Sequence, residues 1–247
     1  MKPLKDIRFF GCANVPGPGK GQPSSSSELV GIPKSAPRLG QRVARMLQSQ
    51  GFSVGDYDHI YIVFTPALPD GEVAPTDHRP ERWMRYVACG IPARFKDLPD
   101  DEKLQQIQAA TFGVLRTLKP DSIQFLESVR ELLDRHGSRT RILRAIKETK
   151  AYRFEVWFDV PPWPEPAYLY VLARDNASGE VLEAPPFPLK DYEDVFPLVS
   201  TISFTKGMLN LNPRKSFRAG LSINSYPAPI QIPLAEFTRQ ATDPNGP

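Results

Sequence analysis

The sequence predicts an α+β fold, in which the C-terminal half forms most of one antiparallel sheet and three helices pack on a face or end of it. Three observations predict this fold. Apolar residues recur at helical spacing in three segments before residue 137, whereas apolar and polar residues alternate after residue 150. Proline is frequent, at 27 of 247 residues, which favours short strands and irregular loops over long helices. Helices and strands that are segregated along the chain in this way are typical of α+β proteins rather than of doubly wound parallel sheets.

The N-terminal part of the chain predicts a strand, a loop and a helix. Residues 7–10 are expected to form a short first strand. The Gly-, Pro- and Ser-rich residues 14–36 cannot contribute to a core and are expected to form a flexible loop. A helix is predicted over residues 37–50, because proline suits its first turn and Gly51 can end it. The apolar face of this helix is formed by Leu39, Val43, Met46 and Leu47.

Two more strands and two more helices are expected before residue 138. Residues 59–64 form a β-rich run typical of a buried strand, and residues 82–88 alternate well enough for another strand. Apolar residues lie along one face of residues 100–118 and along one face of residues 121–136. Both segments therefore predict amphipathic helices, and Gly137 is expected to end the second.

The hydrophobic period becomes that of a strand near residue 150, which predicts a run of antiparallel strands. Residues 139–147 fit either a helix or a strand, and we favour a strand that forms a hairpin with residues 152–159. Lys206-Gly207 indicates a tight hairpin turn. Further strands are expected at residues 168–174, 180–182, 198–205, 208–211, 216–224 and 230–234. We expect one α+β domain over residues 1–238 and a disordered tail over residues 239–247.

The sequence shows no feature of a secreted or membrane-spanning protein. Residues 1–10 lack the apolar core of a secretory signal, and no stretch approaches the ~18 consecutive apolar residues of a membrane span. The two cysteines, Cys12 and Cys89, make no disulfide framework and no CxxC motif. We therefore expect a cytoplasmic protein with reduced thiols and no membrane partner.

Motifs for phosphate binding and for nucleophilic catalysis are incomplete. Residues 11–21 follow the first strand and contain a Gly-Lys pair, as a phosphate-binding loop does. However, Asn14 stands where that motif needs glycine, and Gly21 stands where it needs serine or threonine. No GxSxG turn is present, and neither cysteine lies in a nucleophile signature. The sequence therefore predicts no catalytic residues, and we do not expect an enzyme.

Two acid–histidine groups contain side chains that can bind a metal ion. Asp56, Asp58 and His59 lie together, and Asp77 is followed by His78. Neither group has the spacing of a strong metal motif, and aspartate is common in turns such as these. We expect no metal and no cofactor.

Charge is segregated in the C-terminal half. Residues 135–153 carry seven basic side chains against one acid, and residues 175–194 carry six acids against one base. The two segments either face each other in the fold or provide a charged surface that directs association with a partner. Nucleic-acid binding by the basic segment is an alternative, but the acidic segment would repel a phosphate backbone and no nucleic-acid-binding motif is present. A nucleic-acid partner is therefore not expected.

Several stretches carry a resemblance to one class of proteins. They are DHIYIVFTPAL, the paired helices around DDEKLQQIQAATFGVLRTL and DSIQFLESVRELLDRHG, and KDYEDVFPLVSTISF followed by LNLNPRKSFRAGLSI. Over residues 55–237 this order of elements resembles bacterial immunity proteins of polymorphic-toxin and type VI secretion systems. The resemblance implies a cytoplasmic, catalytically inert protein that binds and neutralises one cognate toxin. The alternative is a nucleic-acid-binding protein or an enzyme of unknown activity.

An inhibitor of this kind needs aromatic and charged residues that anchor its partner. Tyr192 lies among Asp191, Glu193 and Asp194, and aromatic anchors rimmed by charge dominate many interfaces. The other interpretation is that Tyr192 packs inside the fold. Trp157 and Trp163 are further candidates, the latter within a Pro-Pro-Trp-Pro segment. The resemblance implies that the acidic residues meet the partner, because many such toxins carry basic clefts.

Overall fold

The computed structural model describes residues 2–17, 30–77, 79 and 81–239. Contacts within the chain gather into two compact units, Met1–Ser138 (unit 1) and Arg139–Pro247 (unit 2). The sequence predicted one domain over residues 1–238, so this division is a feature that it did not indicate. Each unit is described by itself.

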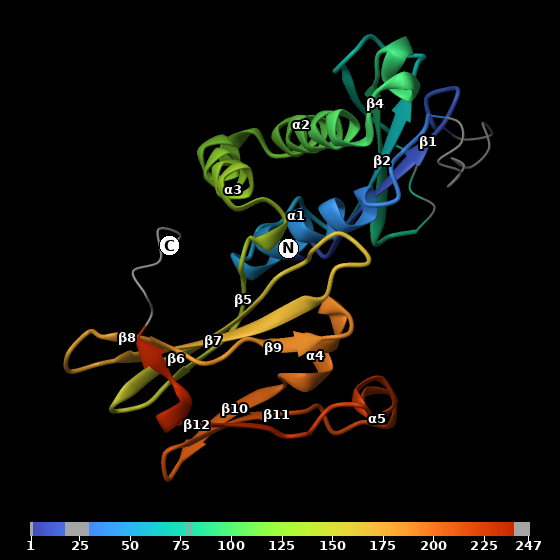
Figure 1. The fold of residues 1–247 in the computed structure, drawn as a ribbon. Coiled ribbons are helices and arrows are strands. Elements are labelled where there is room, and N and C mark those ends of the chain that lie inside the picture. The colour runs from blue at the N-terminus through green and yellow to red at the C-terminus, as the bar shows by residue number, and fades with distance from the viewer. Residues whose placement is uncertain (1, 18–29, 78, 80, 240–247) are drawn as a thin grey trace. The chain divides into compact units, whose positions relative to one another are not determined.

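Unit 1 contains a four-stranded sheet in the order β1-β2-β4-β3 (Figure 1). β1 (Asp6–Gly11), β2 (His59–Thr65) and β4 (Met84–Gly90) are parallel, and β3 (Val73–Pro75) runs antiparallel at the edge. Six consecutive residues of β2 are buried, as expected for a central parallel strand that is covered on both faces. The sequence predicted the three longer strands as elements but not a parallel sheet of their own.

Three helices belong to unit 1: α1 (Ala36–Ser49), α2 (Asp100–Leu118) and α3 (Ile123–His136). α1 packs on β1, and Gly40 permits this close approach because a Cβ there would overlap the carbonyl oxygen of Ile7. Gly51, with φ of 72°, follows the end of α1 as predicted. α2 contacts β3, β4 and α3, and the last contact includes a hydrogen bond from Gln108 to Asp134 of 2.7 Å. Short 3-10 turns at Ala93–Asp97, Pro120–Ser122 and Gly137–Arg139 connect these elements.

Unit 2 confirms the antiparallel sheet predicted for the C-terminal half. Its larger sheet has the order β13-β8-β7-β6-β5, and β9 also pairs with β7. All of these pairings are antiparallel. The strands are β5 (Ile142–Glu148), β6 (Tyr152–Phe158), β7 (Ala167–Asp175), β8 (Val181–Glu183), β9 (Phe187–Leu189) and β13 (Thr238–Arg239). β5 confirms the strand that we favoured over a helix at residues 139–147.

A second antiparallel sheet in unit 2 contains β10 (Thr201–Thr205), β11 (Met208–Asn212) and β12 (Ile230–Pro233). The predicted hairpin turn joins β10 to β11, with positive φ at both Lys206 and Gly207. Aromatic side chains pack between the two sheets: the ring of Phe154 on β6 lies 4.8 Å from that of Phe204 on β10. The ring of Phe158, also on β6, lies 5.6 Å from that of Phe196 on α4 (Val195–Leu198). Aromatic residues of β6 therefore pack against both the smaller sheet and α4.

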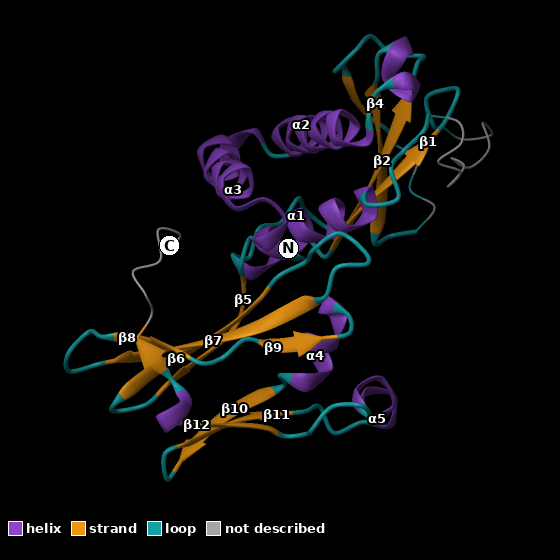
Figure 2. Cartoon of the chain, viewed as in Figure 1, coloured by secondary structure: helices purple, strands orange, loops and turns teal. Residues whose placement is uncertain are grey.

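The predicted strand at residues 216–224 is wrong, because this segment forms the helix α5 (Phe217–Ile223). The hydroxyl of Ser216 accepts a hydrogen bond from the backbone N–H of Ala219, which caps the helix. Ala219 and Ile223, four residues apart, are the buried positions. With α4 (Val195–Leu198), five α-helices occur in the described residues, against three predicted (Figure 2). Further 3-10 turns are η4 (Tyr192–Asp194) and Leu234–Glu236.

Two sequence predictions fall partly outside the described residues. Residues 18–29 of the expected loop at 14–36 and residues 240–247 of the expected tail are not described. Residue 239, the first of that tail, belongs to β13.

Candidate protein-binding surface

The loop between β6 and β7 presents an exposed tryptophan. Trp163, one of the predicted partner-binding residues, has 75% of its surface exposed. By comparison, Trp83 in unit 1 is 38% exposed and Trp157 on β6 is half-buried. A large aromatic side chain left in solvent to this extent is a feature of binding surfaces rather than of cores.

The loop that carries Trp163 is fixed by a buried carboxylate. Asp159, directly after β6, is fully buried. It accepts hydrogen bonds from the Tyr168 backbone N–H at 2.7 Å, from Arg139 Nη1 at 3.0 Å and from Tyr170 Oη at 3.0 Å. These three bonds join the end of β6 to the start of β7 and to the residues before β5.

Arg139 extends this network to the far side of the loop. Its Nη2 donates to Glu165 Oε2 at 2.8 Å and its Nη1 donates to the carbonyl oxygen of Pro166 at 3.1 Å. The Glu165 backbone N–H in turn donates to the carbonyl oxygen of Pro162 at 2.9 Å. Trp163 thus lies on a loop whose two sides are held by one arginine. Neither Arg139 nor Asp159 was selected from the sequence.

The surroundings of Tyr170 and Arg139 keep both side chains protonated, as their hydrogen bonds to Asp159 require. Burial raises the pKa of Tyr170, and the charge of Asp159 raises it further, so the phenol stays protonated and donates. Burial lowers the pKa of Arg139, but the hydrogen bond and the charge of Asp159 outweigh burial and raise it overall. The network therefore contains a charged guanidinium and a neutral phenol at neutral pH.

Trp157 lies in the sheet rather than in a loop. It pairs across the ladder with Tyr170, and its indole N–H donates to Glu155 Oε2 at 3.2 Å. The guanidinium of Arg141 stacks 4.2 Å from the ring centre of Tyr170 and forms an ion pair with Glu183 at 3.0 Å. Trp157 is therefore part of a mixed aromatic and charged sheet face and is less accessible than Trp163.

The four predicted residues 191–194 form the turn η4 and are largely engaged within it. Tyr192 is only 3% exposed, and its hydroxyl hydrogen-bonds to Glu193 Oε1 at 3.1 Å. Asp191 and Asp194 form a capping box: Asp191 accepts from the Glu193 backbone N–H at 2.9 Å, and Asp194 accepts from the Asp191 backbone N–H. Asp194 Oδ2 also accepts a hydrogen bond from the Tyr226 hydroxyl at 2.5 Å. This geometry favours the packing interpretation for Tyr192, and of the four residues Glu193 alone is exposed.

The remaining acids of residues 175–194 also have partners within unit 2. Asp175 accepts hydrogen bonds from the backbone N–H groups of Ala177 and Ser178 in its own turn, at 2.8 and 2.9 Å, and these bonds lower its pKa. Glu180 pairs with Arg239, and the pair Arg141–Glu183 joins the acidic and basic segments. On the basic side, Lys147 and Lys150 have no ion pair with any part of the chain that the structure describes.

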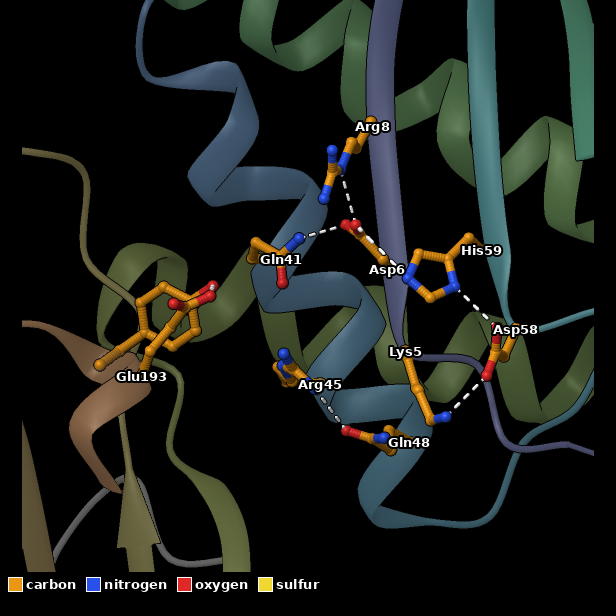
Figure 3. Close-up of polar contacts among 10 residues, drawn as sticks. Lys5, Asp6, Arg8, Gln41, Arg45, Gln48, Asp58, His59 and Glu193 are labelled. Atoms are coloured by element: carbon orange, nitrogen blue, oxygen red, sulfur yellow. Dashed lines mark hydrogen bonds and ion pairs between the residues drawn. The ribbon is translucent and has the colours of Figure 1, made fainter. Parts of the chain in front are cut away.

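A polar cluster in unit 1 surrounds the predicted Asp58–His59 group (Figure 3). His59 Nδ1 lies 2.7 Å from Asp58 Oδ1, and its Nε2 lies 3.9 Å from Asp6 Oδ2. Lys5 pairs with Asp58 at 2.7 Å, and Arg8 pairs with Asp6 at 2.6 Å. Burial raises the pKa of Asp58, but the hydrogen bonds from Lys5 and His59 outweigh burial and lower it overall.

This cluster is a set of satisfied ion pairs rather than an open site. Both carboxylates are buried and already have cationic partners. Asp56, which the sequence grouped with them, instead pairs with Arg79 at 3.1 Å. Among the described residues no group of three His, Cys, Asp or Glu side chains could hold a metal ion. His78 lies outside the described residues.

Cys89 is not placed for nucleophilic chemistry. Cys89 is fully buried in β4, and burial raises the pKa of its thiol to about 11. Cys12 is half-buried after β1. A thiol with this pKa is protonated at neutral pH, so Cys89 is a core residue.

Comparisons with known proteins add no family. No family model, no curated protein and no solved structure matches this chain. Within the residues that the structure describes, no helix is long and apolar enough to cross a membrane. The functional argument therefore rests on the geometry of the chain itself.

Proposed function

We propose that this chain is an inhibitory binding protein of the immunity type, which binds a cognate toxin protein in the cytoplasm and blocks it without catalysis. The observation that supports this proposal most directly is Trp163, 75% exposed on a loop that Asp159 and Arg139 hold in place. The resemblance of residues 55–237 to immunity proteins agrees with it.

A rigid exposed tryptophan is well suited to anchor a protein partner. Tryptophan is enriched among the residues whose truncation costs most at interfaces, often about 2 kcal/mol or more. Ordering a loop on binding has an entropic cost, and a loop that is already fixed avoids much of it. Arg139 and Asp159 therefore act as positioning residues for Trp163.

The acidic residues 191–194 fit this role less well than Trp163. Asp191 and Asp194 already cap η4, so a partner that used them would have to replace these bonds. Tyr192 could reach a partner only if η4 opened, because it is buried. The proposal therefore places the main anchor on the β6–β7 loop.

The proposal is tested by capture followed by a toxicity assay. The tagged full-length chain and its Trp163→Ala variant are used to capture proteins from cells that naturally encode it. Each protein enriched by the wild type is then expressed alone and with the chain in an unrelated bacterium. We expect one captured protein to arrest growth alone, the wild-type chain to restore growth, and Trp163→Ala to bind this protein at least about tenfold more weakly.

Trp83→Ala is the matched control, because Trp83 packs edge-on against His59 in unit 1 and is half as exposed as Trp163. It should bind the toxin as the wild type does. The proposal is wrong if no captured protein is toxic, if the chain does not restore growth, or if Trp163→Ala binds unchanged.

A further inference from the structure

α5 presents an apolar ridge that the core of unit 2 does not use. Phe217 is 84% exposed and Leu221 is 59% exposed. They lie four residues apart, so they share one face of the helix. The opposite face, with Ala219 and Ile223, is buried, and α5 contacts α4 (Figure 1). The helix is therefore already anchored, and its outer face is available to another molecule.

The ridge is flanked by positive charge that the chain does not neutralise. Arg214, Lys215 and Arg218 are all exposed next to Phe217. None of the three forms an ion pair with the described residues, and the chain contains no Asp or Glu from residue 195 to residue 235. An apolar ridge with an unneutralised basic border is complementary to an apolar groove with an acidic rim.

We propose that Phe217 and Leu221 insert into an apolar groove of an acidic protein partner, whose rim carboxylates pair with Arg214, Lys215 and Arg218. This inference deepens the proposed function by stating the chemistry of the toxin's surface, and it rests on that function only for the identity of the partner. The resemblance implied that acidic residues of this chain meet a basic surface of the toxin, whereas this inference gives the toxin an acidic surface. The reason is that the acidic residues of this chain are engaged internally whereas these three cations form no ion pair with the described residues.

The other occupants of such a ridge fit less well. A second copy of the chain would bring the same three cations together across a two-fold contact, and like charges disfavour this. Helices that bind membrane surfaces bury a larger apolar face than two side chains on seven residues provide. A nucleic-acid backbone would contact the cations but would leave the exposed Leu221 without an apolar environment.

The test uses the full-length chain and two labelled peptides in fluorescence anisotropy. One peptide is a helical hairpin whose two helices form a leucine-lined groove with glutamate along its rim, and the other has lysine in place of each glutamate. We expect saturable binding of the glutamate peptide and none of the lysine peptide. Raising NaCl from about 50 mM to about 300 mM should weaken binding, because the cations are exposed and are screened by salt.

Two sets of variants separate the ridge from its border. Phe217→Ser with Leu221→Ser removes the ridge and keeps the charges, while Arg214→Gln, Lys215→Gln and Arg218→Gln remove the charges and keep the ridge. Each set should raise the dissociation constant of the glutamate peptide by about tenfold or more. All five side chains are exposed, so the variants should fold, which circular dichroism verifies.

Trp163→Ala distinguishes this inference from the proposed function. It should bind the peptide as the wild type does, because Trp163 lies on another element. If the peptide binds but no toxin is found, only the proposed function fails. The present inference is overturned if the glutamate peptide does not saturate, if the lysine peptide binds equally, or if the serine variants bind unchanged. It is also overturned if phosphatidylserine vesicles, a single-stranded oligonucleotide or self-association depend on the ridge more strongly than the peptide does.

Discussion

At the scale of single residues, the most consequential side chain is the buried carboxylate of Asp159. It is fully buried and has three hydrogen-bond donors, two from β7 and one from Arg139 before β5. Burial of a charge is costly unless it is paired and hydrogen-bonded, and here both conditions are met. Asp159 helps to hold the loop of Trp163, because it binds Arg139, which also donates to Glu165 and to the carbonyl oxygen of Pro166.

Replacing Asp159 by alanine should therefore destabilise the protein strongly. The change leaves the Tyr170 hydroxyl and the Tyr168 backbone N–H without this acceptor and removes one of the carboxylates that Arg139 binds, and we expect the free energy of unfolding to fall by about 3 kcal/mol. Glu165→Ala is the matched control, because its ion pair with the same arginine is half exposed and should contribute at most about 1 kcal/mol. Urea denaturation measures both changes, and an equal loss in the two variants would contradict the role given to Asp159.

The sequence predicted Trp163 as a partner-binding residue, but it did not indicate the residues that hold its loop. Trp163 was proposed because it lies in a rigid Pro-Pro-Trp-Pro segment; the structure shows that it is exposed, and its binding role stays a prediction. Asp159 and Arg139 are separated by 20 residues and meet only because β5 and β6 form a hairpin, so no local pattern shows their contact. The one local signal is that two acids, Asp159 and Glu165, flank the Pro-Pro-Trp-Pro segment. It could have pointed to the carboxylates of the network but not to Arg139.

At the scale of elements, local turn and strand signals predicted several elements of unit 2 correctly. The alternation of residues 152–159 predicted β6, and the Lys-Gly pair predicted the β10–β11 turn. The prediction for residues 216–224 failed because the apolar residues there, at positions 217, 219, 221 and 223, alternate as in a strand although the segment forms a helix. The serine cap and the contact with α4 select the helix, and that contact cannot be seen in the sequence.

The β10–β11 turn carries a strain that substitution should relieve. Two-residue turns of this kind need positive φ at both positions, and Lys206 has φ of 50° although it has a side chain. Lys206→Asn should raise the free energy of unfolding by about 0.5–1 kcal/mol, because asparagine tolerates this conformation better. Gly207→Ala should lower it by about 1 kcal/mol, since φ there is 74°. Both are measured by denaturant unfolding, and a destabilising Lys206→Asn would contradict this account.

At the scale of the whole molecule, the division into two units coincides with the change of hydrophobic period. The boundary lies at residues 138 and 139, directly after Gly137, whose φ is 57°. Helical periodicity ends there, and strand alternation begins shortly after it. The sequence predicted a change of period near residue 150 but no division into two units. It did not reveal that the N-terminal strands form a parallel sheet, because parallel pairing joins β1 to β2 across more than forty residues.

The existence of a separate core in each unit leads to a prediction about fragments. In unit 2, Phe154 of the larger sheet packs against Phe204 of the smaller sheet, and Phe158 packs against Phe196 of α4, so the unit has an apolar core of its own. A fragment of residues 139–247 should therefore fold alone, with a β-rich circular dichroism spectrum and one cooperative urea transition. Asp159→Ala should shift this transition as it does in the full-length chain, because all of its hydrogen-bond partners lie within the fragment. A fragment without a cooperative transition would show that unit 2 needs unit 1 to fold, and the two units would then have to be regarded as one domain.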